Sequence, residues 1–195
     1  MKIKRKDTKT RIIEKASFLI HKKGYRSTGV MEIVSAVGIK KGGFYHYFIS
    51  KDDLGLKVLD SSEFEFTEFL DKVLSNNNPE KALNNFLDSI FMEHRNNEFI
   101  GGCIFGNMAL EMADENQIFA DVITGIFLNW IKKIEKVVLA AQEKSQLRKD
   151  ISAGTLARHI VLSIEGGIML SRLTKNEAAL KETIELLKIF LKPIN

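Results

Sequence analysis

The 195-residue sequence has one cysteine, two prolines and no long uncharged run. Because Cys103 stands alone, it can form neither an internal disulfide nor a multi-cysteine zinc site, which is typical of a protein from a reducing compartment. The longest stretch without an acidic or basic residue covers residues 99–110, short of the roughly 20 residues that a transmembrane helix needs. No apolar signal region follows the basic N-terminus. We therefore expect a cytoplasmic protein with no membrane association, no metal and no cofactor.

The motifs of common enzyme classes are also missing. The sequence has no P-loop, no glycine-rich dinucleotide fingerprint, no nucleophile elbow and no HExxH pattern. Glu111, Asp114 and Glu115 share helical spacing, but no histidine follows a glutamate by three residues, so the di-iron signature is absent. We expect that the protein is not an enzyme.

Charge is distributed unevenly along the chain. The net charge is +4, yet residues 1–51 carry 13 Lys and Arg against three acidic residues, and the remaining 144 residues sum to -6. All three tyrosines lie in the basic segment. A compact basic segment joined to an acidic body favours a polyanionic partner for the first part alone. A solvated charged face is the alternative reading of such a cluster.

Apolar periodicity predicts four helices in the first 74 residues. The first ends at Gly24, and the second runs from a cap at Thr28 to Gly38. A short third helix follows this glycine directly, and a long fourth helix opens at Ser50 and runs to about Leu74. Two short helices joined by a glycine turn, with another helix behind them, predict a helix-turn-helix module.

The same segment resembles a known family, the TetR/AcrR transcriptional regulators. The residues that carry the resemblance are Thr28, Val37, Gly38, Lys41, Gly42, Phe44, Tyr45, His46, Tyr47, Phe48, Ser50, Lys51 and Leu54. The likeness covers residues 7–60. The family pattern usually has Ser or Thr where Lys40 stands and often a hydroxyl residue at Gly43, so base preference is expected to differ.

The resemblance implies which residues meet DNA. Contacts to the DNA backbone are implied for Thr28, Tyr45, Tyr47 and Lys51. Lys40, Lys41 and His46 are candidates for base or phosphate contact, because a lysine can donate to guanine and to phosphate oxygens. Gly42 and Gly43 would let the two backbones approach closely. The alternative readings place Phe44 and Phe48 in the core, give Tyr47 a packing role and make His46 structural.

Five further helices are predicted after the linker at residues 75–78. They cover about 79–95, 103–113 and 118–143, a segment that starts at Ser152, and a last helix that contains Leu180 and Leu191. No strand pattern is present. We expect an all-α fold of about nine helices, with a DNA-binding domain at residues 6–66 joined by a long helix to a helical bundle at residues 67–195.

In the family that the sequence resembles, the second domain binds a small effector and dimerises through its last two helices. The small and apolar residues that would form this interface are Ser163, Gly166, Gly167, Ser171, Leu180, Ile184, Leu187 and Leu191. Small residues allow close helix approach, and an apolar stripe supplies buried area for a symmetric contact. Ordinary packing within one chain is the alternative.

An effector pocket would be mostly apolar with a few polar groups. The candidates from the predicted bundle are Phe91, Cys103, Phe105, Asn107, Met108, Glu111, Phe127, Trp130, His159 and Met169. Many of these side chains would serve equally well as core. Asn107 and Glu111 are one helical turn apart on an apolar helix, and a buried carboxylate there needs a partner. That partner would be an effector, or a basic residue such as Arg158 or Arg172.

The sequence thus predicts a homodimeric repressor that binds a palindromic operator in double-stranded DNA and is released by an unidentified small molecule. One alternative has the same architecture but senses an oxidant or electrophile through Cys103. The other is a helical protein-interaction module without specific DNA binding. Selection of DNA sequences by the protein would separate this module from the DNA-binding readings.

Overall fold

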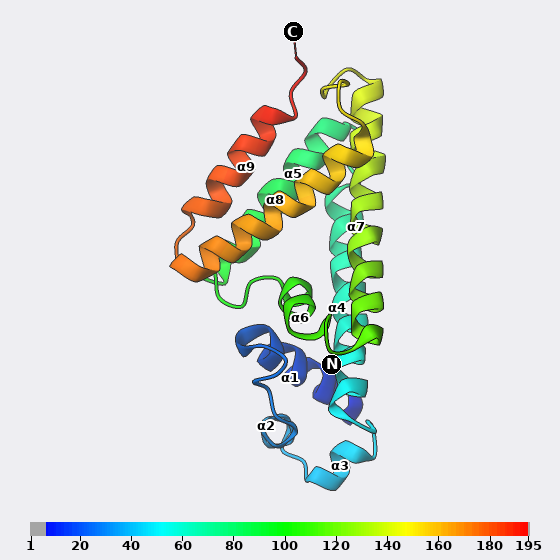
Figure 1. Cartoon of the computed structure of the whole chain (residues 1–195), viewed down its shortest axis with the longest axis vertical. Helices are drawn as coiled ribbons and strands as arrows, with labels where there is room; N and C mark the ends of the chain where they lie inside the picture. Colours follow the sequence, from blue (N-terminus) through cyan, green and yellow to red (C-terminus); the bar gives the residue numbers. More distant parts are fainter. Residues whose placement is uncertain (1–6, 195) are drawn as a thin grey trace, which may run out of the picture. The chain divides into compact units, whose positions relative to one another are not determined.

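A computed structural model of the chain describes residues 7–194, and all regular structure in this range is helical (Figure 1). The helices of this range are α1 (Thr8–Lys23), α2 (Val30–Val37), α3 (Lys41–Tyr45), α4 (Lys51–Val73), α5 (Pro79–Asn96), α6 (Ile104–Met112), α7 (Gln117–Glu143), α8 (Ala153–Thr174) and α9 (Ala178–Phe190). The predicted all-α fold is confirmed, and the nine helices of the described residues match the expected number. None of these helices is long and apolar enough to cross a bilayer.

Side chains at several helix starts explain where the helices begin. The carboxylate of Asp7 accepts the Thr10 N–H at 2.8 Å, and this backbone hydrogen bond holds the pKa of Asp7 below its ordinary value. Asn78 accepts the Lys81 N–H at 3.1 Å ahead of the proline that opens α5, and Ser152 accepts the Thr155 N–H at 3.2 Å. Each cap satisfies a backbone donor that has no partner inside its helix.

By their internal contacts the helices form two units. The first unit contains the chain up to Glu65 together with Ile104–Ile123, and the second contains Phe66–Cys103 and the chain from Thr124 onward. The expected division at residue 66 placed α6 and the start of α7 with the second part. In the structure, α6 and the start of α7 instead belong to the first unit. There α6 contacts α1, and Phe119 of α7 is fully buried against Tyr25, with ring centroids 5.4 Å apart.

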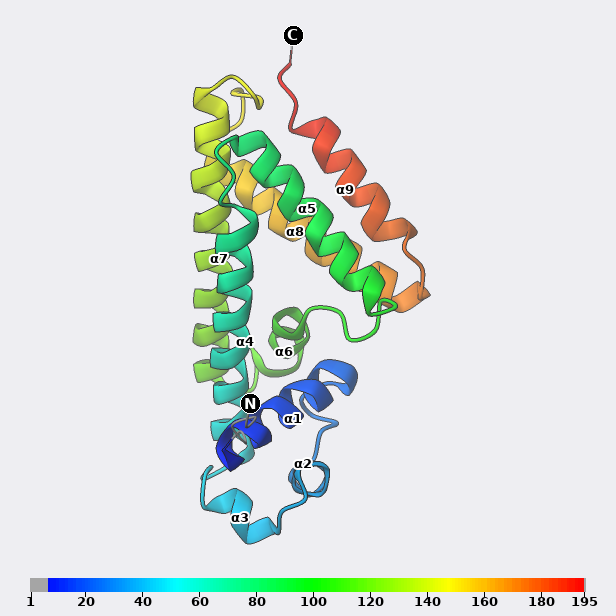
Figure 2. The ribbon, with the colours of Figure 1, turned by 180° about the vertical axis from the view of Figure 1, so that it is seen from behind.

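The second unit is built around α5, α8 and α9. The last helix, α9, packs along both α8 and α5 (Figure 2). Gly167 lets α9 approach α8, since a Cβ at this position would lie 3.1 Å from Leu180 Cδ1 and 3.2 Å from Leu180 Cα. Beside it, the buried Ser171 hydroxyl accepts the Leu180 N–H at 3.0 Å and so satisfies a donor in the first turn of α9.

Candidate nucleic-acid interface

A glycine turn sets the direction of α3 in the first unit. Gly38 follows α2 in the left-handed conformation, with φ 76° and ψ 39°. Its N–H and that of Ile39 donate back to Val34 O, both at 3.0 Å, which closes the carbonyl end of α2. Arg11 of α1 donates to Val37 O at 2.6 Å. The turn is therefore fixed from two sides, and α3 follows it after two residues (Figure 1).

Aromatic side chains anchor α3 from within. Phe44 is 0% exposed and Phe48 is 1% exposed, and their ring centroids lie 5.6 Å apart. Both residues thus have the core role that was one reading of the sequence. Because two large side chains point inward, the opposite side of this short helix must face solvent.

The exposed side of α3 and its flanks gathers most of the residues predicted to bind DNA. Lys40, Lys41, Gly42, Tyr45, His46 and Tyr47 are all exposed, and Gly43 is half-buried. Tyr45 lies beside Lys41, whose Nζ is 5.9 Å from the centre of the tyrosine ring, and the rings of His46 and Tyr47 lie 4.9 Å apart. Cationic and hydroxyl donors on one solvent-facing turn suit a phosphate backbone and the edges of bases.

Thr28 does not belong to this exposed group. Its side chain is 0% exposed, and its hydroxyl donates to Gly24 O at 2.8 Å inside the protein. The residue that caps α2 is Gly29, without a side-chain hydrogen bond. The prediction that Thr28 caps this helix is therefore wrong, and the side chain of Thr28 does not face solvent in this structure. The hydroxyl instead shapes the turn between α1 and α2.

Lys51 lies at the start of α4, where it is partly covered by neighbouring groups. Its Nζ is 4.3 Å from the centre of the Tyr25 ring and 3.4 Å from Arg26 O. Burial lowers the pKa of Lys51, and the negative charges of Asp52 and Glu111 oppose this shift. A lysine held in this way has a defined position from which to meet a phosphate.

Tyr25, which the sequence did not single out as a site residue, lies under Lys51. Its hydroxyl donates to Asp52 at 2.5 Å, and Asn116 donates to the other oxygen of the same carboxylate at 3.2 Å. Burial raises the pKa of Tyr25 far above its ordinary value, and the hydrogen bond to Asp52 adds to this effect. Gly55 is required here, since a Cβ would lie 2.7 Å from the Tyr25 ring.

Glu111 has a different role from the predicted one. Its two carboxylate oxygens accept the backbone N–H groups of Tyr25 and Arg26, at 3.0 and 2.6 Å. The Arg26 side chain donates to Glu111 O at 2.7 Å and also pairs with Glu115. The basic residue that bonds to this segment is therefore Arg26. The sequence suggested Arg158 or Arg172 as the partner of Glu111, and neither bonds to its carboxylate. Both oxygens accept hydrogen bonds within the first unit, so this carboxylate has partners inside the protein, as in the alternative that needs no effector.

Two family models match this chain. Residues 12–58 match the one described as bacterial regulatory proteins, tetR family, and residues 79–187 match the one described as tetracyclin repressor-like, C-terminal domain. The chain belongs to the TetR family of DNA-binding transcriptional regulators. The first match covers the helix-turn-helix described above, with α2 and α3 inside it.

Named relatives of this TetR-family regulator are themselves regulators. The chain is similar to the HTH-type transcriptional repressor DhaR of Mycobacterium sp. (strain GP1), with 25% identity over 173 residues that cover 88% of this chain and 85% of DhaR. It is also similar to the transcriptional regulator AcuR of Cereibacter sphaeroides, with 30% identity over 153 residues, 77% of this chain and 70% of AcuR. Both proteins are transcriptional regulators by name.

Solved structures of the TetR family have the same fold. A regulatory protein TetR from Rhodobacter sphaeroides superposes with a TM-score of 0.88 at 26% identity, over 93% of this chain and 97% of that one. A TetR transcriptional regulator from Legionella pneumophila gives a TM-score of 0.85 at 26% identity, over 98% and 100% of the two chains.

The residues predicted to bind an effector are divided between the two units of this regulator. Phe105, Asn107, Met108 and Glu111 belong to the first unit, while Phe91, Cys103, Phe127, Trp130, His159 and Met169 belong to the second. In the second unit Trp130 packs against Phe127 and Phe66, with ring centroids 5.1 and 4.2 Å away. His159 is exposed, and Met169 is 56% exposed. These two lie on the surface of the second unit and not in an enclosed pocket.

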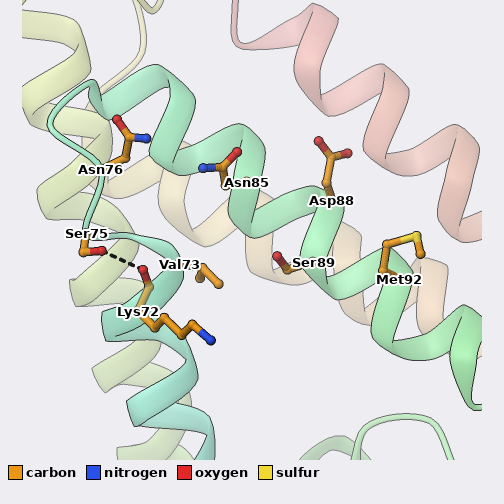
Figure 3. Close-up of a pocket in the computed structure, with 8 residues that line it drawn as sticks. All are labelled: Lys72, Val73, Ser75, Asn76, Asn85, Asp88, Ser89 and Met92. Carbon is orange, nitrogen blue, oxygen red and sulfur yellow. Dashed lines mark hydrogen bonds between the residues drawn. The ribbon is translucent and has the colours of Figure 1, made fainter.

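The second unit has a cavity that the sequence did not indicate. Its volume is about 430 Å³, and it lies where α4 ends and α5 passes (Figure 3). Eight residues line it: Lys72, Val73, Ser75, Asn76, Asn85, Asp88, Ser89 and Met92. One wall is fixed by the Ser75 hydroxyl, which donates to Lys72 O at 2.7 Å (Figure 3). Six of the eight lining residues have polar side chains, Val73 and Met92 are apolar, and no predicted effector residue contributes to the lining.

Most residues of the predicted dimer interface pack inside one chain. Leu180 is 0% exposed, and Ile184, Leu187 and Leu191 are each at most 4% exposed. Gly167 and Ser171 are buried where α8 meets α9. Only Ser163 and Gly166 retain exposed area. Another set of apolar side chains faces solvent on the same two helices: Leu162, Met169, Leu170, Leu173, Leu186 and Ile189.

No group of three or more His, Cys, Asp or Glu side chains that could hold a metal ion occurs among residues 7–194. The lone thiol, Cys103, is half-buried and donates a hydrogen bond to Glu165. Burial raises the pKa of Glu165, and this hydrogen bond works against the shift.

Proposed function

We propose that this TetR-family regulator is a cytoplasmic homodimeric repressor that binds a palindromic operator and leaves it when a small molecule binds the second unit. The observation that carries the DNA-binding part is the exposed side of α3. Lys40, Lys41, Tyr45 and His46 face solvent there, directly after the fixed turn at Gly38. In the helix-turn-helix geometry this second helix enters the major groove.

The dimer would form through the exposed apolar side of α8 and α9. Leu162, Met169, Leu170 and Leu173 recur at the spacing of one helix face, and Gly166 leaves open space between them. Scattered apolar side chains are ordinary on a surface, whereas a continuous stripe along two packed helices marks an interaction site. A two-fold dimer would place two recognition helices on half-sites about one turn, or 34–36 Å, apart.

Release requires an effector that binds the two conformations of the dimer unequally. We place the effector in the second unit. In the first unit, the carboxylate of Glu111, the one charged side chain among the predicted effector contacts, already accepts two backbone hydrogen bonds. The cavity beside Lys72 and Asp88 offers both polar side chains and apolar surface, the latter including Val73 and Met92. A small molecule with both polar and apolar groups is the class that such a lining would hold.

The alternative in which Cys103 senses an oxidant or electrophile is less well supported. The reactive form of cysteine is the thiolate, which a neighbouring cation or helix dipole favours. The thiol of Cys103 instead donates to a half-buried carboxylate, Glu165, whose negative charge would oppose a thiolate. We therefore retain a reversible small-molecule effector as the primary reading.

The first test is selection of random DNA duplexes by the purified full chain. At about 150 mM salt, non-specific attraction to phosphate is weakened strongly, so an enriched palindrome would report specific binding. Lys41→Ala should abolish the enrichment, whereas Lys132→Ala, which removes an exposed lysine from α7, should leave it intact. A folded dimer that enriches no sequence would contradict the proposal and favour the helical interaction module.

A further inference from the structure

The turn between α1 and α2 carries a binding site for one carboxylate of the same chain. Two successive backbone N–H groups, of Tyr25 and Arg26, point at the two oxygens of Glu111. Consecutive N–H groups of this kind form a concave site for an anion. The anion comes from α6, 85 residues further along the chain than Arg26.

Gly24 shows that the turn and the carboxylate fit closely. Its φ of +97° is a conformation that residues with a Cβ rarely adopt. A Cβ at this position would also lie 2.6 Å from Glu111 Oε1, closer than real contacts allow. Glycine is thus required at position 24 for two reasons: its backbone conformation and the closeness of the Glu111 carboxylate.

The clamped turn also supports Lys51, a residue predicted to contact the DNA backbone. Lys51 lies over the Tyr25 ring and against Arg26 O, and α2 begins at Val30, four residues after Arg26. No side chain caps α2, so its start relies on the backbone that leads into it and on its buried residues. A displacement of Tyr25 and Arg26 would move both elements.

We propose that Glu111 is a positioning residue for DNA binding: its carboxylate clamps the backbone of Tyr25 and Arg26 so that Lys51 and the start of α2 meet the DNA backbone in register. This inference rests on the proposed function. Glu111 acts through the turn and does not itself touch DNA. Charge alone predicts the opposite effect, since removing a negative charge near a polyanion strengthens attraction. The sign of the change in affinity therefore separates the two readings.

The test uses Glu111→Gln, which keeps the shape of the side chain and removes its charge. A glutamine presents one accepting oxygen and one donating NH2 group, so it cannot accept from both backbone N–H groups. We expect operator affinity to fall at least about tenfold at 150 mM salt, with a salt slope shallower by about one phosphate contact. Binding is measured by fluorescence anisotropy well below the unfolding temperature of each variant.

Glu115→Gln is the matched control. It removes the same charge from the region just after α6, but the carboxylate of Glu115 pairs with the side chain of Arg26, and both partners of this ion pair are more than half exposed. We expect its operator affinity to stay within about threefold of the wild type, since exposed ion pairs contribute little. A Glu111→Gln variant that binds as tightly as the wild type, or more tightly, would overturn the proposal.

A second measurement does not depend on DNA. Amide hydrogen exchange at Tyr25 and Arg26 should accelerate in Glu111→Gln and remain slow in Glu115→Gln, because only the first change removes an acceptor. If the wild type selects no operator, the proposed function fails, while faster exchange would still show that Glu111 holds the turn. Unchanged exchange at both amides in folded Glu111→Gln would refute the clamp itself.

Discussion

At the scale of single residues, Gly42 and Gly43 are neighbours in α3 that differ in what surrounds them. A Cβ at Gly42 would meet no atom within 4 Å, whereas one at Gly43 would lie 3.7 Å from Ile39 Cβ, an ordinary contact. Neither glycine has a positive φ. Glycine inside a helix costs up to about 1 kcal/mol relative to alanine. Nothing within the chain requires glycine at position 42. We therefore propose that the missing Cβ allows the DNA backbone to approach α3 closely.

The change Gly42→Ala should therefore stabilise the protein and weaken its binding to DNA. We expect the unfolding temperature to rise by about 2–4 °C for each kcal/mol gained, and operator affinity to fall at least about tenfold. Gly125→Ala, at an exposed and open position of α7, is the control that changes stability alone. Retained affinity in Gly42→Ala would argue against close approach at this position.

Glu165 gives a prediction for pH. Its pKa is raised in the folded protein, chiefly by burial, so the folded state binds the proton more tightly than the unfolded state. Stability is then lost as pH rises from the ordinary carboxyl pKa of about 4.3 through the raised value. Glu165→Gln should unfold a few degrees higher than the wild type at pH 7, and this difference should vanish below about pH 4.

Thermal melts of both proteins across this pH range provide the measurement. Glu185→Gln, at an exposed position of α9, should show no such pH-dependent gain. A constant difference at every pH would mean that packing and not ionisation separates Glu165→Gln from the wild type.

Thr28 and Glu111 show where sequence reasoning fails at this scale. The exposed residues of α3 could be placed because the turn at Gly38 and the inward Phe44 determine which side faces solvent. Helical spacing also placed Glu111 correctly on α6. It could not reveal that its partners would be backbone N–H groups in the turn after α1, because no local pattern encodes a hydrogen bond across 86 residues.

At the scale of elements, α2 lacks a side-chain cap. Gly29 occupies the cap position with φ -90° and ψ 150°, and a Cβ there would meet nothing within 4 Å. This is the conformation that a capping serine adopts. We expect Gly29→Ser to raise the free energy of unfolding by about 0.5–1 kcal/mol, from a new hydrogen bond to α2 and a less flexible unfolded chain.

Two variants separate these causes in urea denaturation. Gly29→Ala tests the change in chain entropy without a cap, so it should gain less than Gly29→Ser. Gly38→Ala should instead destabilise by about 1–2 kcal/mol, because its backbone is left-handed, with φ 76°. Equal gains from serine and alanine at position 29 would show that no cap forms.

Helix starts and ends were the most predictable elements. Asn78 before proline and Ser152 before an apolar helix are local signals, and both residues cap in the structure. The start of α2 was placed one residue early, because Thr28 and Gly29 are both acceptable caps by type. The structure distinguishes them because the Thr28 hydroxyl donates a buried hydrogen bond to Gly24 O and is not available to cap α2.

At the scale of the whole molecule, the sequence predicted the all-α class but not the grouping of its helices. The expected division after residue 66 placed everything beyond it in one bundle. Residues 104–123 instead join the first unit through Glu111, Asn116 and Phe119. These contacts connect positions more than 60 residues apart, and such long-range pairing leaves no periodic signal in a single sequence.

The exposed stripe on α8 and α9 leads to the last prediction. Leu173 is 76% exposed and Leu186 is 66% exposed, so a charged side chain at either position should leave the folded chain intact. If two copies pack through this surface, Leu173→Lys would place a cation in an apolar interface on both sides of the two-fold axis, where burying an unpaired charge is costly. We expect a monomer by analytical ultracentrifugation, with an unfolding curve that no longer depends on protein concentration.

Leu128→Lys supplies the control, because Leu128 is 57% exposed on α7, outside the proposed interface. This variant should remain dimeric. Monomeric Leu173→Lys should also lose most of its affinity for a palindrome while keeping its weak attraction to a single half-site, since the recognition surface on α3 is unchanged. If Leu173→Lys stays dimeric and binds the operator normally, this surface is not the dimer interface. The interface must then lie elsewhere on the second unit.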